Sequence, residues 1–362
     1  MFYLGGVGLA FFLTLLLLSK KKKTTADNFL AGWLFFITLH LLLFYFWMNE
    51  LYPELLGAGF PLPLVHGPFL YLYTLALTQG RIKKVSLLHF APALGVLLYM
   101  IPFLSLSAEE KLEVFRNQGA GYEVFNTIRL VLNISSGIIY IVLSSMALYK
   151  HRRAIVNEFS STEKINLQWL QYLIYWLGAI WACVIIGSEE SIYITVVLFV
   201  LFIGYFGIRQ ASIFHSSDSD PDDEPQNDTP EETGDKPKYQ KSGLSPESSE
   251  NLHRDLSQLM STEKFFRESE LSLTDLAKRL NTLPNHLSQV INEREGKNFY
   301  DYINSLRIEE FMRLVNSPES QKYTLLGIAQ ECGFNSKSSF NRYFKKVTGK
   351  SPSEFMQSAP VP

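Results

Sequence analysis

The stretch that decides the fold is residues 324–352, TLLGIAQECGFNSKSSFNRYFKKVTGKSP. Its pattern predicts a helix, a tight turn and a second helix. Gly333 suits a turn with a positive φ angle, because glycine has no Cβ to clash there. Ser336 is the expected N-cap of the second helix, since its hydroxyl accepts a bond from an N–H of the first turn. Gly349 predicts the end of that helix, and Pro352 is expected to prevent its resumption.

The second helix of this stretch has two chemically different faces. Apolar residues at i, i+3, i+4 and i+7 predict a buried stripe of Phe340, Tyr343, Phe344 and Val347. The opposite face carries Lys337, Ser338, Asn341, Arg342 and Lys345. A buried aromatic stripe behind a basic polar face is typical of a recognition helix that lies in a DNA major groove.

These residues give the sequence a resemblance to the AraC/XylS family of bacterial transcription regulators. It rests on positions of the family's C-terminal helix-turn-helix signature, matched by Ile328-Ala329, Cys332-Gly333-Phe334, Phe340, Phe344, Gly349 and Ser351-Pro352. The resemblance extends back to about Leu271 and covers roughly the last quarter of the chain. It implies two helix-turn-helix units, joined by one long helix, that enter successive major grooves roughly 34 Å apart.

The first of these units is expected just before the long helix. Its first helix is marked by Leu273, Leu276, Ala277 and Leu280, with Ser272 or Thr274 near the N-cap. Pro284 opens the next helix, whose inward residues are Leu287, Val290 and Ile291. Its outward residues are then Asn285, His286, Ser288, Gln289 and Asn292. Asn and Gln are suited to adenine edges, so this helix is expected to contact bases.

The sequence departs from the family pattern at two positions. Leu283 stands where the cap before Pro284 is usually Ser, and a leucine cannot accept the capping bond. Either Thr282 caps one residue earlier or the helix start is weaker. Phe311 replaces a small alanine in the joining helix, so local packing is expected to differ.

The candidate DNA contacts divide by chemistry. Phosphate contacts are expected from Lys337, Arg342, Lys345 and Lys346. Base contacts are expected from Asn285, His286, Ser288, Gln289, Ser338 and Asn341. The alternative for each is a solvated helix face. His286 has no partner His or Cys at ligand spacing, so we predict no metal and no cofactor. The sequence has no nucleophile elbow, P-loop, kinase signature or zinc motif, so we predict that the chain is not an enzyme.

The first 210 residues have a different composition, dominated by long apolar runs. Seven such runs predict membrane spans, at residues 2–18, 28–48, 60–79, 86–106, 125–149, 167–187 and 191–208. Basic clusters follow the first, third and fifth runs, whereas the alternate loops are acidic. Basic loops stay in the cytoplasm, so the N-terminus is expected outside and residue 209 inside. The predicted location is therefore the cytoplasmic (inner) membrane, with multiple spans.

Polar residues inside these runs are candidates for binding a signal ligand. They are His40, His66, His89 and Asn133. Three histidines on consecutive spans suit a ligand or proton site, but we favour separate hydrogen bonds between helices.

The two halves are expected to be joined by an acidic, unfolded linker at residues 211–243. Residues 244–266 then predict an amphipathic helix that either braces the DNA-binding domain or contacts a second copy, and we favour bracing. A homodimer stays open.

The sequence thus predicts an all-α protein with a seven-helix transmembrane bundle (1–210) and a double helix-turn-helix domain (244–362). The expected function is a membrane-bound transcription regulator whose partners are double-stranded DNA, the lipid bilayer and an unidentified signal ligand. Two alternatives are a passive membrane anchor and a transporter or channel with a regulatory DNA-binding tail. Prolines in the third and fourth runs lack a matching second set, which weakens the transporter alternative.

Overall fold

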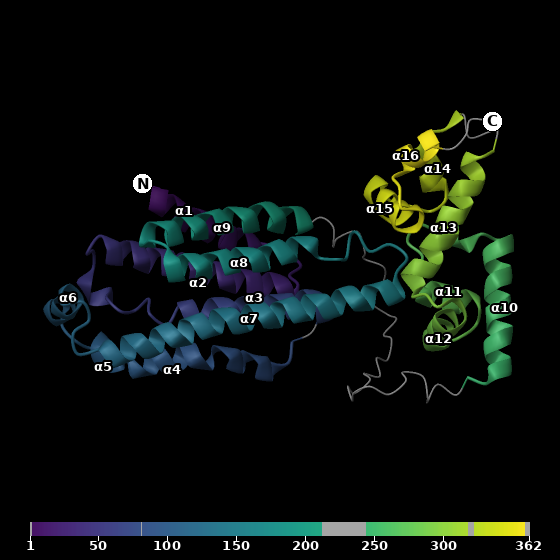
Figure 1. Cartoon of the computed structure of the whole chain (residues 1–362). Helices are drawn as coiled ribbons and strands as arrows, with labels where there is room; N and C mark the ends of the chain where they lie inside the picture. Colours follow the sequence, from purple (N-terminus) through teal and green to yellow (C-terminus); the bar gives the residue numbers. More distant parts are fainter. Residues whose placement is uncertain (1, 81, 212–243, 318–321, 359–362) are drawn as a thin grey trace. The chain divides into compact units, whose positions relative to one another are not determined.

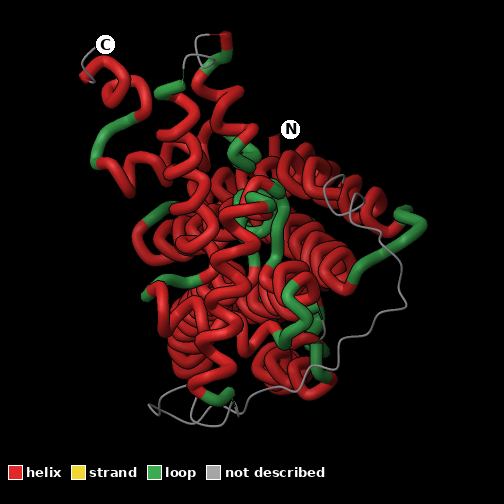
Figure 2. Tube along the Cα trace, turned by 90° about the vertical axis from the view of Figure 1, so that its right-hand side faces the viewer, coloured by secondary structure: helices red, strands yellow, loops and turns green. Residues whose placement is uncertain are grey.

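Helices joined by turns and loops make up the part of the chain that the structure describes (Figure 2). The computed structural model describes residues 2–80, 82–211, 244–317 and 322–358. It consists of two compact units, Met1–Lys150 with Leu167–Ser219 and His151–Asn166 with Asp220–Pro362. The one β-type pairing within the described ranges is an isolated bridge between Phe159 and Ser272. The all-α prediction is confirmed, whereas the predicted acidic linker lies almost entirely outside the described residues.

The first unit is a bundle of long apolar helices (Figure 1). Its principal helices are α1 (Phe2–Leu18), α2 (Thr25–Met48), α3 (Pro63–Gln79), α7 (Glu123–Glu158), α8 (Gln168–Ile186) and α9 (Glu189–Ala211). Shorter elements are η1 (Pro53–Leu55), η2 (Lys84–Phe90), α4 (Ala91–Tyr99), α5 (Ile101–Leu104) and α6 (Ala108–Arg116). A capping box at Thr24 begins α2, because the Thr24 hydroxyl and the Asp27 carboxylate each accept a backbone N–H of the other residue.

Four of the described helices are long and apolar enough to cross a membrane. They are α2, α7, α8 and the first 18 residues of α9. By comparison, α1 and α3 have 17 residues each, and at 1.5 Å per residue they are about 25 Å long, short of a hydrocarbon core of about 30 Å. The predicted count of seven spans is therefore not confirmed.

The prediction of one continuous helix at residues 86–106 is wrong. This run forms η2, α4 and α5, with a break at Met100. Pro92 stands in the first turn of α4, and Pro102 in the first turn of α5. A proline ring clashes with the carbonyl four residues earlier and offers no N–H, so a helix ends before it. Apolar composition alone could not reveal that break.

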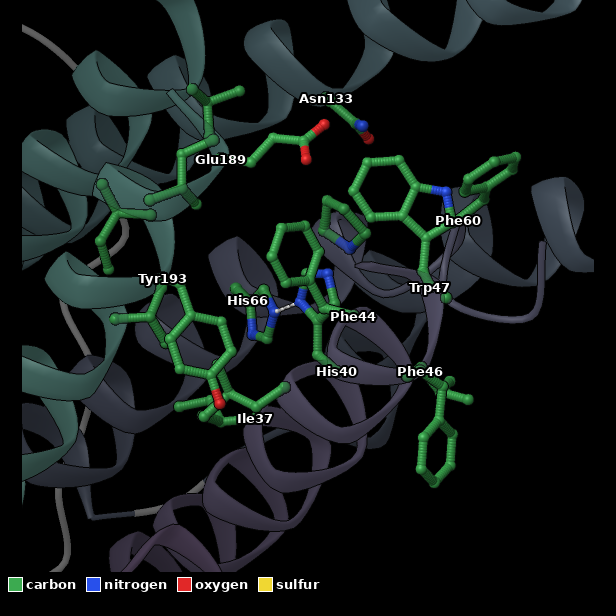
Figure 3. A pocket seen from close by; sticks show the side chains of 18 of the residues that line it. Ile37, His40, Phe44, Phe46, Trp47, Phe60, His66, Asn133, Glu189 and Tyr193 are labelled. Carbon is green, nitrogen blue, oxygen red and sulfur yellow. Dashed lines mark hydrogen bonds between the residues drawn. The ribbon is translucent and has the colours of Figure 1, made fainter. Parts of the chain in front are cut away.

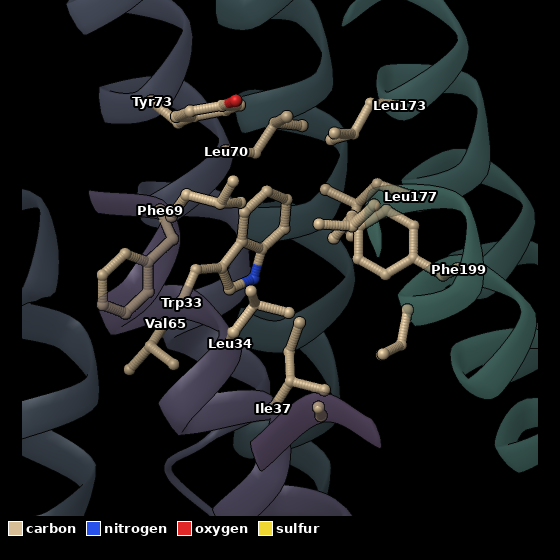
Figure 4. Close-up of a cluster of buried hydrophobic side chains, with 14 of the residues drawn as sticks. Trp33, Leu34, Ile37, Val65, Phe69, Leu70, Tyr73, Leu173, Leu177 and Phe199 are labelled. Carbon is tan, nitrogen blue, oxygen red and sulfur yellow. The ribbon is translucent and has the colours of Figure 1, made fainter. Parts of the chain in front are cut away.

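The core of the first unit forms around Trp33 of α2 (Figure 4). Its side chain is completely buried, and its ring meets Phe199 of α9 edge-on with centroids 5.5 Å apart. Leu70 of α3 and Leu173 and Leu177 of α8 lie in the same buried cluster. Four helices therefore share one apolar core.

The second unit contains two smaller cores that share one helix. Its helices are α10 (Pro246–Thr262), η4 (Phe265–Arg267), α11 (Leu273–Arg279), α12 (Pro284–Glu295), α13 (Phe299–Val315), α14 (Leu325–Glu331), α15 (Lys337–Thr348) and α16 (Pro352–Ser358). One core joins α10, α11 and α12 to the start of α13, including Ile303. The other joins the end of α13, including Ile308, to α14 and α15. This arrangement confirms the predicted pair of helix-turn-helix units joined by one long helix (Figure 1).

Candidate nucleic-acid interface and internal cavity

The turn between α14 and α15 has the predicted geometry. Gly333 has a φ of +99°, and a Cβ there would lie 2.7 Å from the Arg267 carbonyl oxygen, so only glycine fits. The Ser336 hydroxyl accepts a bond from the Ser339 backbone N–H at 3.1 Å and caps α15. Gly349, with a φ of +76°, ends α15.

Two details of the α15 prediction are wrong. Phe340, Tyr343 and Phe344 are buried, but Val347 is 53% exposed. Val347 lies in the last turn of α15, where the neighbouring core no longer covers the stripe. Pro352 does not stop helical structure; it is the first residue of α16, a position that needs no N–H donor.

In the first helix-turn-helix unit, the N-terminus of α11 is capped by side chains and that of α12 is not. Ser272 and Asp275 form a capping box at the start of α11. By contrast, Leu283 is the N-cap of α12 and makes no side-chain capping bond, so Thr282 does not replace the missing cap. The alternative of a weaker start to α12 is the one that the geometry bears out.

The outward face of α12 is narrower than predicted. Asn285 is exposed, and His286 and Ser288 are half-buried. Gln289 is buried, so the expectation that it points outward is wrong. Its amide nitrogen Nε2 donates to Glu293 at 2.9 Å, whereas its Oε1 has no partner among the described residues. Helices α10, α11 and α13 all contact α12, so more than one of its faces is covered.

The exposed face of α15 carries the cations predicted to bind phosphate. Lys337, Arg342, Lys345 and Lys346 are all exposed, Ser338 is exposed, and Asn341 is half-buried. The Arg342 guanidinium bonds Glu163 at 2.9 Å and the Tyr300 hydroxyl at 3.2 Å. Lys346 pairs with Asp301 at 2.6 Å. Lys337 and Lys345 form no ion pair with the described residues.

The electrostatic surroundings keep Arg342 charged. Partial burial lowers the pKa of its guanidinium, but the hydrogen bond with Tyr300 and the charge of Glu163 outweigh that effect and raise the pKa overall. The face therefore presents permanent positive charge.

No sequence pattern pointed to the ion cluster around Glu310 of α13. The Glu310 side chain is only 6% exposed and pairs with Lys264 at 2.8 Å, with Arg313 at 2.8 Å and with Arg267. The hydrogen bond from Arg313, which outweighs the effect of burial, holds the pKa of Glu310 well below its ordinary value. This cluster ties α13 to the segment after α10.

Arg307 of α13 was also missed as a structural residue. It is 1% exposed, and it donates from Nε to the Phe266 carbonyl at 2.7 Å and from Nη2 to the Glu268 carbonyl at 2.6 Å. Burial lowers its pKa to about 10, so it stays protonated at neutral pH. A sequence pattern does not distinguish such an arginine from one that binds DNA.

The first unit contains a partly open cavity of about 430 Å³, lined by α2, α3, α7, α8 and α9 and by the connection between α2 and α3 (Figure 3). Its walls are mainly aromatic and aliphatic, and its polar lining residues are His40, His66, Arg129, Asn133 and Glu189. This size is typical of small-molecule sites in proteins. Three of the four predicted ligand candidates, His40, His66 and Asn133, therefore lie on one cavity.

The two cavity histidines form a defined neutral pair. His66 Nδ1 accepts a bond from the Trp33 indole N–H at 3.3 Å, and His66 Nε2 lies 2.9 Å from His40 Nδ1. An indole only donates, so Nδ1 of His66 is unprotonated and its proton is on Nε2. His66 then donates to His40, whose own proton is on Nε2. The bond between His40 and His66 is a hydrogen bond between helices of the kind that we favoured, and both residues also line the cavity.

The other polar candidates differ from this pair. Asn133 is 7% exposed, and its Oδ1 has no partner among the described residues. The Arg129 guanidinium lies over the Phe60 ring, 4.1 Å from its centroid. His89 lies elsewhere, bonded to the Tyr140 hydroxyl at 3.0 Å, so the three histidines do not form one site. Within the described ranges, no three His, Cys, Asp or Glu side chains are grouped to hold a metal ion.

Comparison with known proteins gives a family match within the second unit. The model of a family described as "Helix-turn-helix domain" matches residues 276–358. The "Msm operon regulatory protein" of Streptococcus mutans is 30% identical over 87 residues, which are 24% of this chain and 30% of that protein. The "Uncharacterized HTH-type transcriptional regulator YtdP" of Bacillus subtilis is 30% identical over 90 residues, 25% of this chain and 11% of that protein.

A third relative is an uncharacterized HTH-type transcriptional regulator of Staphylococcus aureus. It is 33% identical over 100 residues, 27% of this chain and 13% of that protein. The chain thus spans less than a third of the length of these relatives. No solved structure matches the chain. The two helix pairs packed on α13 and these matches agree, and the C-terminal domain is a helix-turn-helix domain of the AraC type.

Proposed function

We propose that this chain is a membrane-embedded transcription regulator that binds promoter DNA through its second unit. The observation that carries the proposal is the exposed face of α15, where four cations and two short polar side chains project from a helix held on its other side by buried aromatic residues. Such a face combines salt-dependent phosphate binding with contacts to base edges.

The two helix-turn-helix units contact DNA differently. Lys337, Arg342, Lys345 and Lys346 of α15 bind phosphates, and Ser338 and Asn341 contact bases. On α12 the base contacts come from Asn285, His286 and Ser288. Gln289 is withdrawn from this set because its side chain is buried.

The first unit anchors the regulator in the cytoplasmic membrane. The supporting observation is the outer surface of α7, where apolar side chains are exposed: Ile128, Val131, Leu132, Ile138, Ile139, Val142 and Met146. A row of this length is rare on a protein surrounded by water and is normal for one surrounded by lipid. The basic clusters after α1, after α3 and near the C-terminal end of α7 favour an external N-terminus and a cytoplasmic DNA-binding domain.

The cavity favours a sensor over a passive anchor. The buried Asn133 carbonyl oxygen has no partner among the described residues, which is costly, and a ligand that donates a hydrogen bond to it would remove that cost. The aromatic walls suit a largely apolar ligand. We propose that a small, mostly apolar molecule with one hydrogen-bond donor binds there and is the signal.

The test of DNA binding uses the full chain in lipid nanodiscs. Random duplex DNA is selected on the protein, and the enriched sequences are measured at several salt concentrations. We expect a bipartite motif and an affinity that falls steeply with salt. Equal retention of all sequences, or no retention at low salt, would contradict the proposal.

A further inference from the structure

The segment that follows α7 belongs to the second unit, although α7 itself begins in the first. Phe159 forms the isolated bridge with Ser272, and the Ser160 backbone N–H donates to the Leu271 carbonyl at 3.0 Å. Residues 158–164, named here the docking segment, therefore contact the start of the first helix-turn-helix unit.

The centre of the docking segment is Ser160, which is 1% exposed. Its carbonyl oxygen accepts a bond from Asn304 Nδ2 at 2.9 Å, and its hydroxyl oxygen accepts one from Arg307 Nη2 at 3.1 Å. Asn304 and Arg307 are both almost completely buried on α13. Buried donors of this kind are costly when unpaired, so the serine stabilises the helix that joins the two DNA-binding units.

The ends of the docking segment contact both helix-turn-helix units. The Glu158 carboxylate accepts a bond from the Thr274 hydroxyl at 2.7 Å, on α11. On the other side, the Ser161 hydroxyl accepts a bond from Asn335 at 3.1 Å, in the turn before α15. The segment thus contacts each helix-turn-helix unit as well as α13.

Glu163 of this segment forms an ion pair with Arg342 of the candidate DNA-binding face. Its carboxylate bonds the Arg342 guanidinium at 2.9 Å and accepts a further bond from the Ser161 hydroxyl. A carboxylate and a DNA phosphate are both oxyanions that bind the guanidinium fork. Arg342 cannot give its full set of bonds to both.

We propose that the docking segment is an intramolecular ligand of the DNA-binding domain, held at Ser160 and masking Arg342 with Glu163. The proposal rests on the proposed function, since masking has meaning only if Arg342 binds DNA. It assigns a role to the connection between α7 and α8: the chain segment that leaves α7 lowers DNA affinity while docked. A change in α7 that withdraws the segment frees Arg342.

Docking is tested without DNA in the full chain in nanodiscs. Lys164 Nζ lies 2.6 Å from Glu270 Oε1, so a water-soluble carbodiimide should join the two as an amide, detected by mass spectrometry. Lys164→Arg keeps the charge but cannot be joined in this way, and it is the control. A crosslink in the native chain alone supports docking, and its absence would overturn it.

Masking is tested by DNA affinity. Glu163→Gln should bind DNA about two- to fivefold more tightly, the effect of one exposed ion pair. Glu331→Gln removes the same charge from an exposed position beside the turn and is the matched control. In an Arg342→Ala background Glu163→Gln should give no gain.

Each outcome decides a separate point. An equal gain from Glu331→Gln, or a gain that persists without Arg342, would show a general charge effect and overturn masking. If no form binds DNA at low salt, the proposed function fails and masking fails with it. The crosslink still reports docking in that case, so the two failures are distinguishable.

Discussion

Glu310 is the residue whose replacement most directly tests how the second unit is held together. The change is Glu310→Gln, which keeps the size of the side chain and removes its charge. The carboxylate is nearly buried and bonds three cations whose side chains are 33%, 39% and 57% exposed. Because these cations keep contact with water, each lost pair is expected to cost at most about 1 kcal/mol.

The expected total is a loss of about 2 kcal/mol in the free energy of unfolding at pH 7, since glutamine retains one acceptor oxygen. For a domain of this size such a loss lowers Tm by roughly 8 °C.

The pH dependence has a defined sign. The pKa of Glu310 is lowered in the folded state from an ordinary value of 4.5, mainly by the hydrogen bond from Arg313. Its contribution is therefore complete above about pH 4.5 and is lost as the pH falls through the folded pKa. The difference between native and Glu310→Gln proteins should shrink as the pH falls below 4.5.

The assay is urea unfolding of a fragment of residues 239–362, followed by circular dichroism. Both cores of the second unit are built from residues within this fragment. Glu309→Gln is the matched control, because Glu309 is the neighbouring residue and is exposed. Equal stability of the two variants at pH 7, or a difference that does not change at pH 3, would refute the reasoning.

Three further expectations concern DNA binding, topology and the turn. Arg342→Ala with Lys345→Ala should weaken binding to all DNA sequences and flatten its dependence on salt by about two ions; an unchanged salt slope contradicts the phosphate role. A reporter fused after Arg209 should be active only in the cytoplasm, and an external signal would reverse the proposed orientation. Gly333→Ala should lower unfolding free energy by more than about 2 kcal/mol, measured by urea unfolding, because strain and a clash combine. Gly349→Ala, with a positive φ but open space, should cost about 1 kcal/mol; equal costs would exclude the clash.

Local chemistry explains which parts of the fold are visible in the sequence. The cap at Ser336 and the turn at Gly333 depend on residues within a few positions of each other, and both are present as predicted. The burial of Gln289 depends instead on neighbouring helices that contact α12 from several sides. Periodicity describes one buried face of a helix and does not say how many neighbours it will have.

The same distinction applies to the candidate sites. His40 and Asn133 were identifiable because polar residues are conspicuous in apolar runs. The docking segment was not, since its polar residues resemble an ordinary loop and its partners lie more than 100 positions away, as Ser160 and Arg307 show. A contact of that range leaves no periodic signal. Residue composition also failed to show where prolines divide residues 86–106 into short helices.

The sharing of α13 between two cores has a consequence for folding. Ile303 is buried in one core and Ile308 in the other, about 8 Å further along the helix. Loss of either core would expose part of α13 to water and remove the packing that keeps a helix of 17 residues formed. The two helix-turn-helix units should therefore unfold in a single transition. A partly denatured molecule that keeps one working unit and loses the other is not expected to accumulate.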